Sequence, residues 1–547
     1  MNKENLTAYE VVTEENLTDI HSTGWLLRHK KTGARVMLIE NDDENKVFNI
    51  AFRTPPKDST GVAHILEHSV LCGSREFPLK DPFVELVKGS LNTFLNAMTY
   101  PDKTCYPVAS CNDKDFQNLM HVYLDAVFYP NIYKREEIFR QEGWNYHLEQ
   151  KEGPLKYNGV VYNEMKGAFS SPDEVLEREI MNHLFPDTTY GCESGGDPKN
   201  IPDLTYENFL NFHRTYYHPS NSYIYLYGNM DMEEKLAFLD EHYLSHFDYL
   251  DVDSVIQEQK AFGACRDVTL EYPVAENEGE EDNTYLSYNM VVGNAADSQM
   301  AMAFEVLDYA LLSAPGAPLK QALLDVKAGK DVYGSYDDGI LQPYFTVIAK
   351  GSNPDRKEEF VSVIRQVLGD IVKNGIDRKA VEAGINYFEF RYREADFSSY
   401  PKGLMYSLDI LGDWLYEKGN PFAQVQQLTV FENLKKAVNE GYFEELIRKY
   451  LLENPHGCIM TLVPKKGLAA QREKELEEKL EAYRSSLSEE QLDAMVEKTK
   501  ALEAYQEAGE DPKALECIPM LKRSDIKKEA AKIVNEELTV DNSLFLY

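Results

Sequence analysis

The chain has 547 residues and a mass of 62.7 kDa, so it can bury several hydrophobic cores without metals or disulfides as staples. Its 92 acidic residues outnumber its 57 basic residues, and the net charge of −35 argues against a nucleic acid or an anionic membrane as the main partner, while it permits a cationic substrate. Seven scattered cysteines without a C-x-x-C spacing, an acidic N-terminus and the lack of a long apolar run predict a cytoplasmic protein with no signal peptide and no transmembrane helix.

Residues 1–260 alternate between predicted strands and predicted helices. Strands are expected over 24–55, where two apolar runs flank the hairpin-turn signal Lys31-Thr32-Gly33. The segment from Asp113 to Phe128 carries apolar side chains at helical spacing, which predicts an amphipathic helix. The later elements of this part are helices over 133–144, 175–184 and 206–217, a strand over 222–227 and a helix over 232–243.

The alternation starts again after an acidic stretch at 275–283. Residues 222–243 and 458–480 both have the pattern of a strand, a short turn and a helix, which is a weak sign of an internal repeat. We therefore predict an α+β protein with two similar mixed α/β domains, 1–260 and 261–465, each an antiparallel-rich sheet with packed helices. The elements predicted in the second domain are strands over 284–292, 344–350 and 458–463 and helices over 298–312, 318–326, 357–373 and 378–393.

The composition changes at residue 466, where Glu, Lys, Ala and Leu become abundant. Apolar residues at 4-3-4 spacing from Leu476 to Leu487 mark one helix face, and Ser488-Glu-Glu-Gln491 is a capping box that opens a second helix. These features predict an αα-hairpin linker over 466–530, either packed on another part of the protein or solvated on its outer face. Residues 531–547 begin an apolar strand, and we predict that they start a second half of the protein that is missing from this chain.

The strongest chemical signal is His64-Ile-Leu-Glu67-His68, an H-x-x-E-H pattern on a predicted helix. The two histidines are four residues apart and share a helix face, so both imidazoles can bind one ion. Glu67 lies beside them, within reach of a water bound to that ion, and two imidazoles with one carboxylate and an open position are typical of a catalytic zinc site. The pentapeptide alone leaves open that both histidines are ordinary residues of a surface helix.

Glu164 is the candidate for a third ligand, although the residues alone do not distinguish it from a carboxylate on a helix surface. The chain as a whole resembles the pitrilysin/insulin-degrading family of zinc metallopeptidases, and within it the presequence-protease and falcilysin branch. This resemblance extends from about residue 20 to about residue 530. Besides the H-x-x-E-H helix, the segments that carry it are Cys72–Pro82, Ser90–Asp102, Gln141–Trp144, Asn158–Gly167 and Ile518-Pro519.

The resemblance implies one zinc ion and a role for six residues. The matching positions are His64, His68 and Glu164 for the zinc ligands, Glu67 for the general base, and Asn96 and Ala97 for the edge strand along which substrate backbone is laid. The run from Leu91 to Asp102 has no charge before its last residue, which supports an open sheet edge, although a core strand would look the same. Other branches have a second glutamate seven residues before the third ligand; here that position is Tyr157, so the supporting role is filled elsewhere or absent.

The function implied by the resemblance is a zinc metallo-endopeptidase that degrades unstructured peptides. Relatives have two halves joined by a helical hairpin around a chamber, and this chain matches the N-terminal, zinc-bearing half. The missing C-terminal half is therefore an expected partner, together with peptide substrates, and neither nucleic acid nor membrane is expected. Because that half supplies an arginine and a tyrosine with no counterpart here, the chain alone is expected to be weakly active or inactive.

Two alternatives remain open. A non-catalytic member of the same fold, acting as an interaction or processing subunit, would typically lack a ligand or the base, and all four residues are present here. A structural zinc protein would need a closed site of four ligands, and no suitable fourth Cys or His lies near these motifs. Cys105 and Cys111 flank the expected substrate strand and are predicted to stay reduced, with a redox-sensitive link as the alternative.

Overall fold

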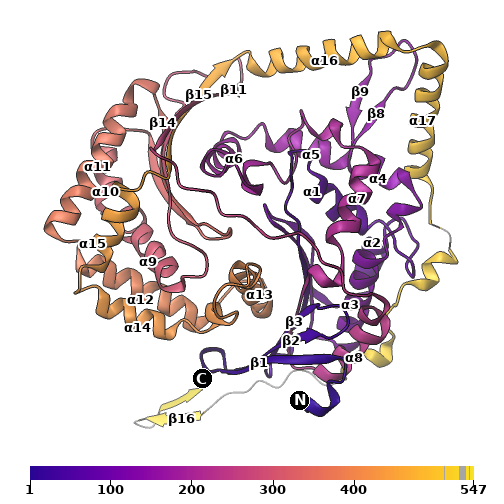
Figure 1. The fold of residues 1–547 in the computed structure, drawn as a ribbon, viewed down its shortest axis with the longest axis horizontal. Helices are drawn as coiled ribbons and strands as arrows, with labels where there is room; N and C mark the ends of the chain where they lie inside the picture. The colour runs from indigo at the N-terminus through magenta and orange to yellow at the C-terminus, as the bar shows by residue number, and fades with distance from the viewer. Residues whose placement is uncertain (511, 529–536, 541–542, 547) are drawn as a thin grey trace.

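The computed structural model describes residues 1–510, 512–528, 537–540 and 543–546. Two units, each a sheet covered by helices, lie side by side: the first part of the chain forms one and the middle part forms the other (Figure 1). A long helix then runs from the second unit back toward the first. The predicted α+β class with two mixed units is therefore confirmed.

The first unit is built on an eight-stranded sheet in the order β1-β2-β3-β10-β4-β7-β5, with β6 also paired to β7. All neighbouring pairs are antiparallel except β3 and β10. Both β4 and β7 are buried along their whole length, as expected for central strands that are covered on both faces. The strands are β1 (Tyr9–Leu17), β2 (Ser22–His29), β3 (Arg35–Glu40), β4 (Lys46–Arg53), β5 (Asn92–Leu95), β6 (Met98–Thr99), β7 (Lys103–Ser110) and β10 (Ser222–Gly228).

The second unit has a five-stranded sheet in the order β11-β15-β12-β14-β13, in which only β11 and β15 are parallel. Without β1, β2 and β6, the first sheet has the same order: the first strand in the chain, then the last, the second, the fourth and the third. In both sheets the parallel pair is the first strand with the last, so the two units repeat one topology. The strands are β11 (Arg266–Val274), β12 (Thr284–Val291), β13 (Asp331–Asp337), β14 (Tyr344–Ser352) and β15 (Gly457–Lys466).

Helices cover both sheets. Those of the first unit are α1 (Val62–Val70), α2 (Pro82–Val87), α3 (Asp113–Phe128), α4 (Glu136–Glu142), α5 (Val160–Ala168), α6 (Pro172–Leu184), α7 (Tyr206–Tyr216) and α8 (Met232–His242). Those of the second are α9 (Ser298–Asp308), α10 (Pro318–Asp325), α11 (Lys357–Asn374), α12 (Arg378–Glu394), α13 (Lys402–Trp414), α14 (Leu428–Ala437) and α15 (Tyr442–Leu446). The helix predicted over 113–128 has these same bounds.

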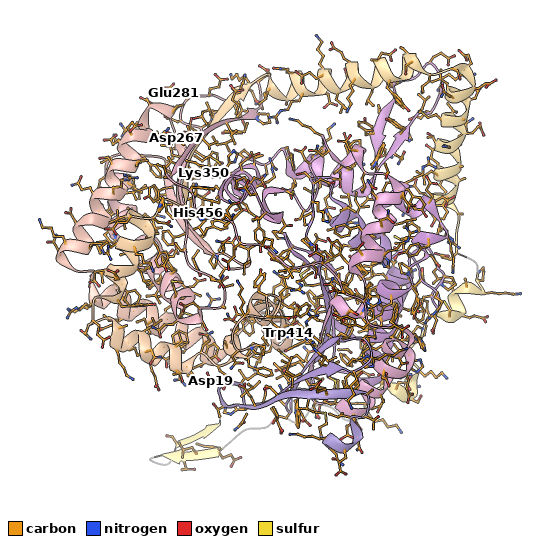
Figure 2. The ribbon with its side chains drawn as sticks, viewed as in Figure 1. Asp19, Asp267, Glu281, Lys350, Trp414 and His456 are labelled. Atoms are coloured by element: carbon orange, nitrogen blue, oxygen red, sulfur yellow. The ribbon has the colours of Figure 1, made fainter. Side chains whose placement is uncertain are left out.

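The two units are tied together by α13, which comes from the second part of the chain and packs on the sheet of the first. Ile410 and Trp414 of this helix join a buried cluster with Tyr223 of β10, and the Trp414 ring, labelled in Figure 2, meets Tyr223 edge-on at 5.1 Å. The fully buried carboxylate of Asp102 adds a second tie, because it accepts hydrogen bonds from the hydroxyls of Tyr190, at 2.7 Å, and Tyr416, at 2.6 Å. The first unit thus keeps a fixed position relative to the second.

The linker consists of α16 (Leu468–Ser486) and α17 (Glu489–Glu507), separated by the predicted capping box at Ser488. Contrary to the predicted αα-hairpin, the two helices diverge from a corner, with α16 along the top of Figure 1 and α17 along its right side. The reason is that their apolar faces pack on a third element: Leu480 and Val496 bury against Leu148 and Leu155 beside the hairpin of β8 (Asn145–His147) and β9 (Lys156–Asn158). The expectation that the linker packs on another part of the protein is met.

The last described residues form a small hairpin of β16 (Glu537–Val540) and β17 (Ser543–Leu546). Most of the rest of the predicted 531–547 segment lies outside the described residues. Within the described part of the chain, no helix is both long enough and apolar enough to cross a membrane.

Candidate metal centre

Helix α1 carries the H-x-x-E-H residues and begins at Gly61, whose φ is +69°. A Cβ at this position would lie only 2.7 Å from the carbonyl oxygen of Gly195, so the close approach of the two segments requires glycine. The approach has a consequence for the site, because the same Gly195 carbonyl accepts a hydrogen bond from Nδ1 of His64 at 3.1 Å. The buried side of α1, with Ile65 and Leu66, holds the helix in the core.

The structure brings His64, His68 and Glu164 together. Oε2 of Glu164, on α5, lies 3.8 Å from Nε2 of His64 and 3.8 Å from Nε2 of His68. Donor atoms at zinc-ligand distance in a tetrahedral site are separated by about 3.3–3.5 Å, so the three atoms surround a position suited to one ion. The Glu164 side chain is 54 % exposed, which leaves this position open on one side.

The second ring nitrogen of His68 also has a partner. Its Nδ1 donates to Oε2 of Glu142, the last residue of α4, at 3.3 Å. Burial raises the pKa of Glu142, but the hydrogen bonds from His68 and Gln141 outweigh it and hold that pKa below its ordinary value. Both imidazoles therefore have Nδ1 engaged and Nε2 turned toward Glu164.

Glu67 lies against the same pair of histidines. One side-chain donor atom from each of His64, Glu67 and His68 falls in a group whose members are all within 4.8 Å of one another. The carboxylate is only 9 % exposed and accepts a hydrogen bond from Oγ1 of Thr99 at 3.1 Å. Burial raises the pKa of Glu67, although the positive charge available on the two histidines opposes this. A buried carboxylate with a raised pKa is suited to accept a proton near neutral pH.

Asn96 and Ala97 lie between β5 and β6, two short strands on the outer side of β7. The backbone N–H of Asn96 donates inward to the carbonyl of Pro107 at 3.4 Å, and its carbonyl accepts from the Tyr123 hydroxyl at 3.3 Å. No described strand pairs with the outer side of β5 or β6, so this stretch is a sheet edge. Thr99 places that edge next to Glu67.

Sequence reasoning did not single out Glu142, Thr99 or Gly195. The first two lie inside segments that carry the family resemblance, but their roles depend on which residues face α1, and spacing along the chain does not reveal that. Tyr157 has an aromatic environment: its ring packs against Trp144 and Tyr146, with centroids 5.6 and 5.4 Å away.

Two other predictions concern cysteines and the second unit. Cys105 is buried, Cys111 is exposed, and both are free thiols. In the second unit, α9 follows β12 as α1 follows β4, but α9 contains no histidine. The histidine pair therefore occurs in only one of the two repeated units.

A cavity of about 730 Å³ lies beside the site, between α6 of the first unit and β13 and β14 of the second. It adjoins the histidines through Glu193, whose Oε1 accepts the backbone N–H of Gly195 at 3.0 Å. Burial raises the pKa of Glu177 and of Glu193. Among the described residues of the lining, Arg178 is the one basic side chain, and the acidic ones are Glu174, Glu177, Glu193, Asp337 and Asp338.

Three family models match successive parts of the chain. The model described as Insulinase (Peptidase family M16) matches residues 52–190, which include the H-x-x-E-H helix and Glu164. Residues 203–388 match the Peptidase M16 inactive domain, in agreement with a second unit whose α9 has no histidine pair. Residues 462–547 match a model for the region associated with subfamily C of the same peptidases, which begins at the end of β15 and includes the linker helices.

Curated relatives match almost the whole chain. Protein HypA of Clostridium perfringens is 50 % identical over 541 residues, which are 99 % of this chain and 56 % of the relative. Presequence protease 1, chloroplastic/mitochondrial, of Arabidopsis thaliana is 42 % identical over 536 residues, 96 % of this chain and 49 % of the relative. The mitochondrial presequence protease of Danio rerio is 35 % identical over 541 residues, with 96 % and 51 % covered. The chain thus spans about half the length of the curated relatives it matches.

Solved structures share the fold at low sequence identity. A protease from Helicobacter pylori matches with a TM-score of 0.61 and 16 % identity, over 83 % of this chain and 99 % of that one. Pitrilysin matches with a TM-score of 0.59 and 16 % identity, over 84 % of this chain and 47 % of that one. From the family models, the relatives and the two-unit fold together, we conclude that the chain belongs to the insulinase family, peptidase family M16, and within it to the presequence-protease-like members.

Proposed function

We propose that this chain is the zinc-bearing half of a metallo-endopeptidase that degrades unstructured peptides. The observation that carries the proposal is the convergence of Nε2 of His64, Nε2 of His68 and Oε2 of Glu164 on one position. Two imidazoles, each with Nδ1 already engaged, and one carboxylate form a donor set that fits a single Zn²⁺ with an open coordination position. When bound there, zinc would polarise a substrate carbonyl and lower the pKa of a water molecule.

Glu67 is the general base in this proposal. Its carboxylate takes a proton from the attacking water and delivers it to the nitrogen of the leaving peptide segment. The bond from Thr99 holds one carboxylate oxygen in place, so the other oxygen is available to the proton. The presence of the base together with all three ligands favours this function over the non-catalytic alternative.

The edge of β5 and β6 is the proposed site for the substrate backbone, with Asn96 and Ala97 alongside it. A peptide that adds to a sheet edge must be extended, so an unstructured peptide can bind there and a folded domain cannot. The acidic cavity beside the site, and the net charge of −35, support a preference for basic peptides.

We further propose that a second half of the protein is the partner that closes over this site. The support is that the chain covers 56 % and 49 % of two relatives that match almost all of it. The cytoplasmic location also stays a prediction, since relatives with the presequence-protease name are mitochondrial or chloroplastic.

The test is hydrolysis of a basic, unstructured peptide by the protein with both halves, with and without a chelator, and with a folded domain as a second substrate. We expect zinc-dependent cleavage of the peptide alone. The 547-residue chain by itself should be at least a hundredfold slower, since loss of oxyanion-type contacts costs about 10²–10³ in rate. Cleavage that ignores the chelator, or equal cleavage of the folded domain, would contradict the proposal, and zinc binding without any hydrolysis would favour the non-catalytic alternative.

A further inference from the structure

The two histidines of the site use chemically different partners for their second ring nitrogen. Nδ1 of His64 donates to the neutral backbone carbonyl of Gly195 at 3.1 Å, whereas Nδ1 of His68 donates to the carboxylate of Glu142 at 3.3 Å. A carbonyl and a carboxylate both fix the tautomer, but only the carboxylate adds a negative charge behind the ring. The two rings are therefore held in different electrostatic surroundings.

Glu142 is itself fixed by neighbours. The residue is 8 % exposed, and its Oε1 accepts from Nε2 of Gln141 at 2.7 Å and from Sγ of Cys72 at 3.6 Å. These contacts leave Oε2 for His68. Each carboxylate oxygen has a separate partner, so the side chain cannot turn away from His68 without losing hydrogen bonds that a buried acceptor needs.

The backbone brings Glu142 to this place. The residue ends α4 and is followed by Gly143, where a Cβ would lie 2.9 Å from Cγ2 of Ile65 on α1. The end of α4 thus lies directly on α1, one turn from His68, and only a residue without a side chain fits at the contact. The carboxylate is in position before any ion binds.

We propose that Glu142 is a positioning residue of the metal centre. It holds His68 with its proton on Nδ1 and its free electron pair on Nε2, and its charge makes the imidazole a stronger ligand. This inference rests on the zinc site proposed above, and it assigns to a residue of α4 a function in that site that neither its helix position nor its burial alone would indicate.

The experiment measures zinc affinity of the 547-residue chain by competition with a chromophoric chelator. Glu142→Ala removes the acceptor and should weaken zinc binding by about 10- to 100-fold, the usual effect of losing such a partner. Glu142→Gln keeps the size and one acceptor oxygen but removes the charge, and its affinity should fall between those of the alanine variant and the unmodified chain. Glu136→Gln, an exposed carboxylate at the start of the same helix, is the matched control and should bind zinc normally.

A second readout separates a role at the ion from a role in folding. The visible absorption bands of bound Co²⁺ report the ligand field, and they should shift in Glu142→Gln but not in Glu136→Gln. If Glu142→Ala does not fold, Glu142→Gln alone decides the matter. Failure of the unmodified chain to bind zinc would refute the proposed zinc site, whereas normal binding by that chain, with affinity and cobalt bands unchanged in Glu142→Gln, would overturn the role of Glu142 alone.

Discussion

The hydroxyl of Thr99 donates a hydrogen bond from Oγ1 to Oε2 of Glu67 at 3.1 Å. Thr99 lies on β6, at the open edge of the sheet, whereas Glu67 lies on α1 between the two histidines. The contact joins the strand on which we propose the substrate backbone is laid to the carboxylate that we propose as the base. It also fixes the orientation of that carboxylate relative to the edge.

Thr99→Val should therefore slow peptide hydrolysis without loss of zinc. The substitution keeps the shape of the side chain and removes the donor, and a hydrogen bond to a charged group contributes about 1.5–3 kcal/mol, which corresponds to a fall in kcat of tenfold or more. Thr99→Ser retains the hydroxyl and is the matched control. Equal kcat for the valine variant and the unmodified protein would show that this bond does not orient the base.

Glu67→Gln should retain zinc and abolish hydrolysis. The amide has nearly the same size as the carboxylate, but it cannot accept the proton of the attacking water. Zinc content by atomic absorption and turnover of an unstructured peptide are the two measurements, made on the protein with both halves. Turnover near that of the unmodified protein would defeat the proposed mechanism.

Alanine at His64, His68 or Glu164 should each lower the zinc content strongly. Every one of these substitutions removes one of three donors, and two remaining donors hold the ion poorly. The measurement is bound zinc per chain after dialysis against a weak chelator. Glu207→Ala, at an exposed position on α7, provides the control and should leave the zinc content unchanged. Full zinc in all three ligand variants would show that the site is assigned wrongly.

The stability of the first unit should fall between about pH 6.5 and pH 4 because of His213. This histidine is 3 % exposed, donates from Nε2 to the carbonyl of Val127 and accepts at Nδ1 from the hydroxyl of Tyr133. Burial lowers the pKa of His213 to about 4, so over this range the unfolded chain binds a proton that the native state does not. The free energy of unfolding therefore decreases as the pH falls, by up to about 3 kcal/mol in total.

Urea unfolding at about pH 7.5 and about pH 4.5 measures this effect. Replacement of His213 by Gln should make the difference between the two pH values smaller, since the group that discriminates between the native and unfolded states is gone. His246→Gln, which removes an exposed histidine, should not change that difference. If both variants show the same pH dependence as the unmodified chain, His213 is not the group responsible.

Local features of the sequence determined much of the fold. The helix of Asp113–Phe128, the hairpin turn at Lys31-Thr32-Gly33 and the capping box at Ser488 were predictable because periodicity, turn residues and caps act over a few neighbouring residues. The pairing of His64 with His68 is of the same kind, since residues four apart on a helix always share a face. The third candidate ligand, Glu164, needed the resemblance, because nothing local distinguishes it.

Tertiary structure alone decided the rest. The shared strand order of the two sheets, the corner between α16 and α17 and the contact of α13 with the first sheet all depend on which apolar surfaces meet, and distant segments supply those surfaces. The same holds for the site: Glu142, Thr99 and Gly195 reach the H-x-x-E-H helix from three other segments. Spacing along the chain determined which residues could bind an ion, but only packing decided which side chains would hold those residues in place, because hydrogen-bond partners are set by distance in space.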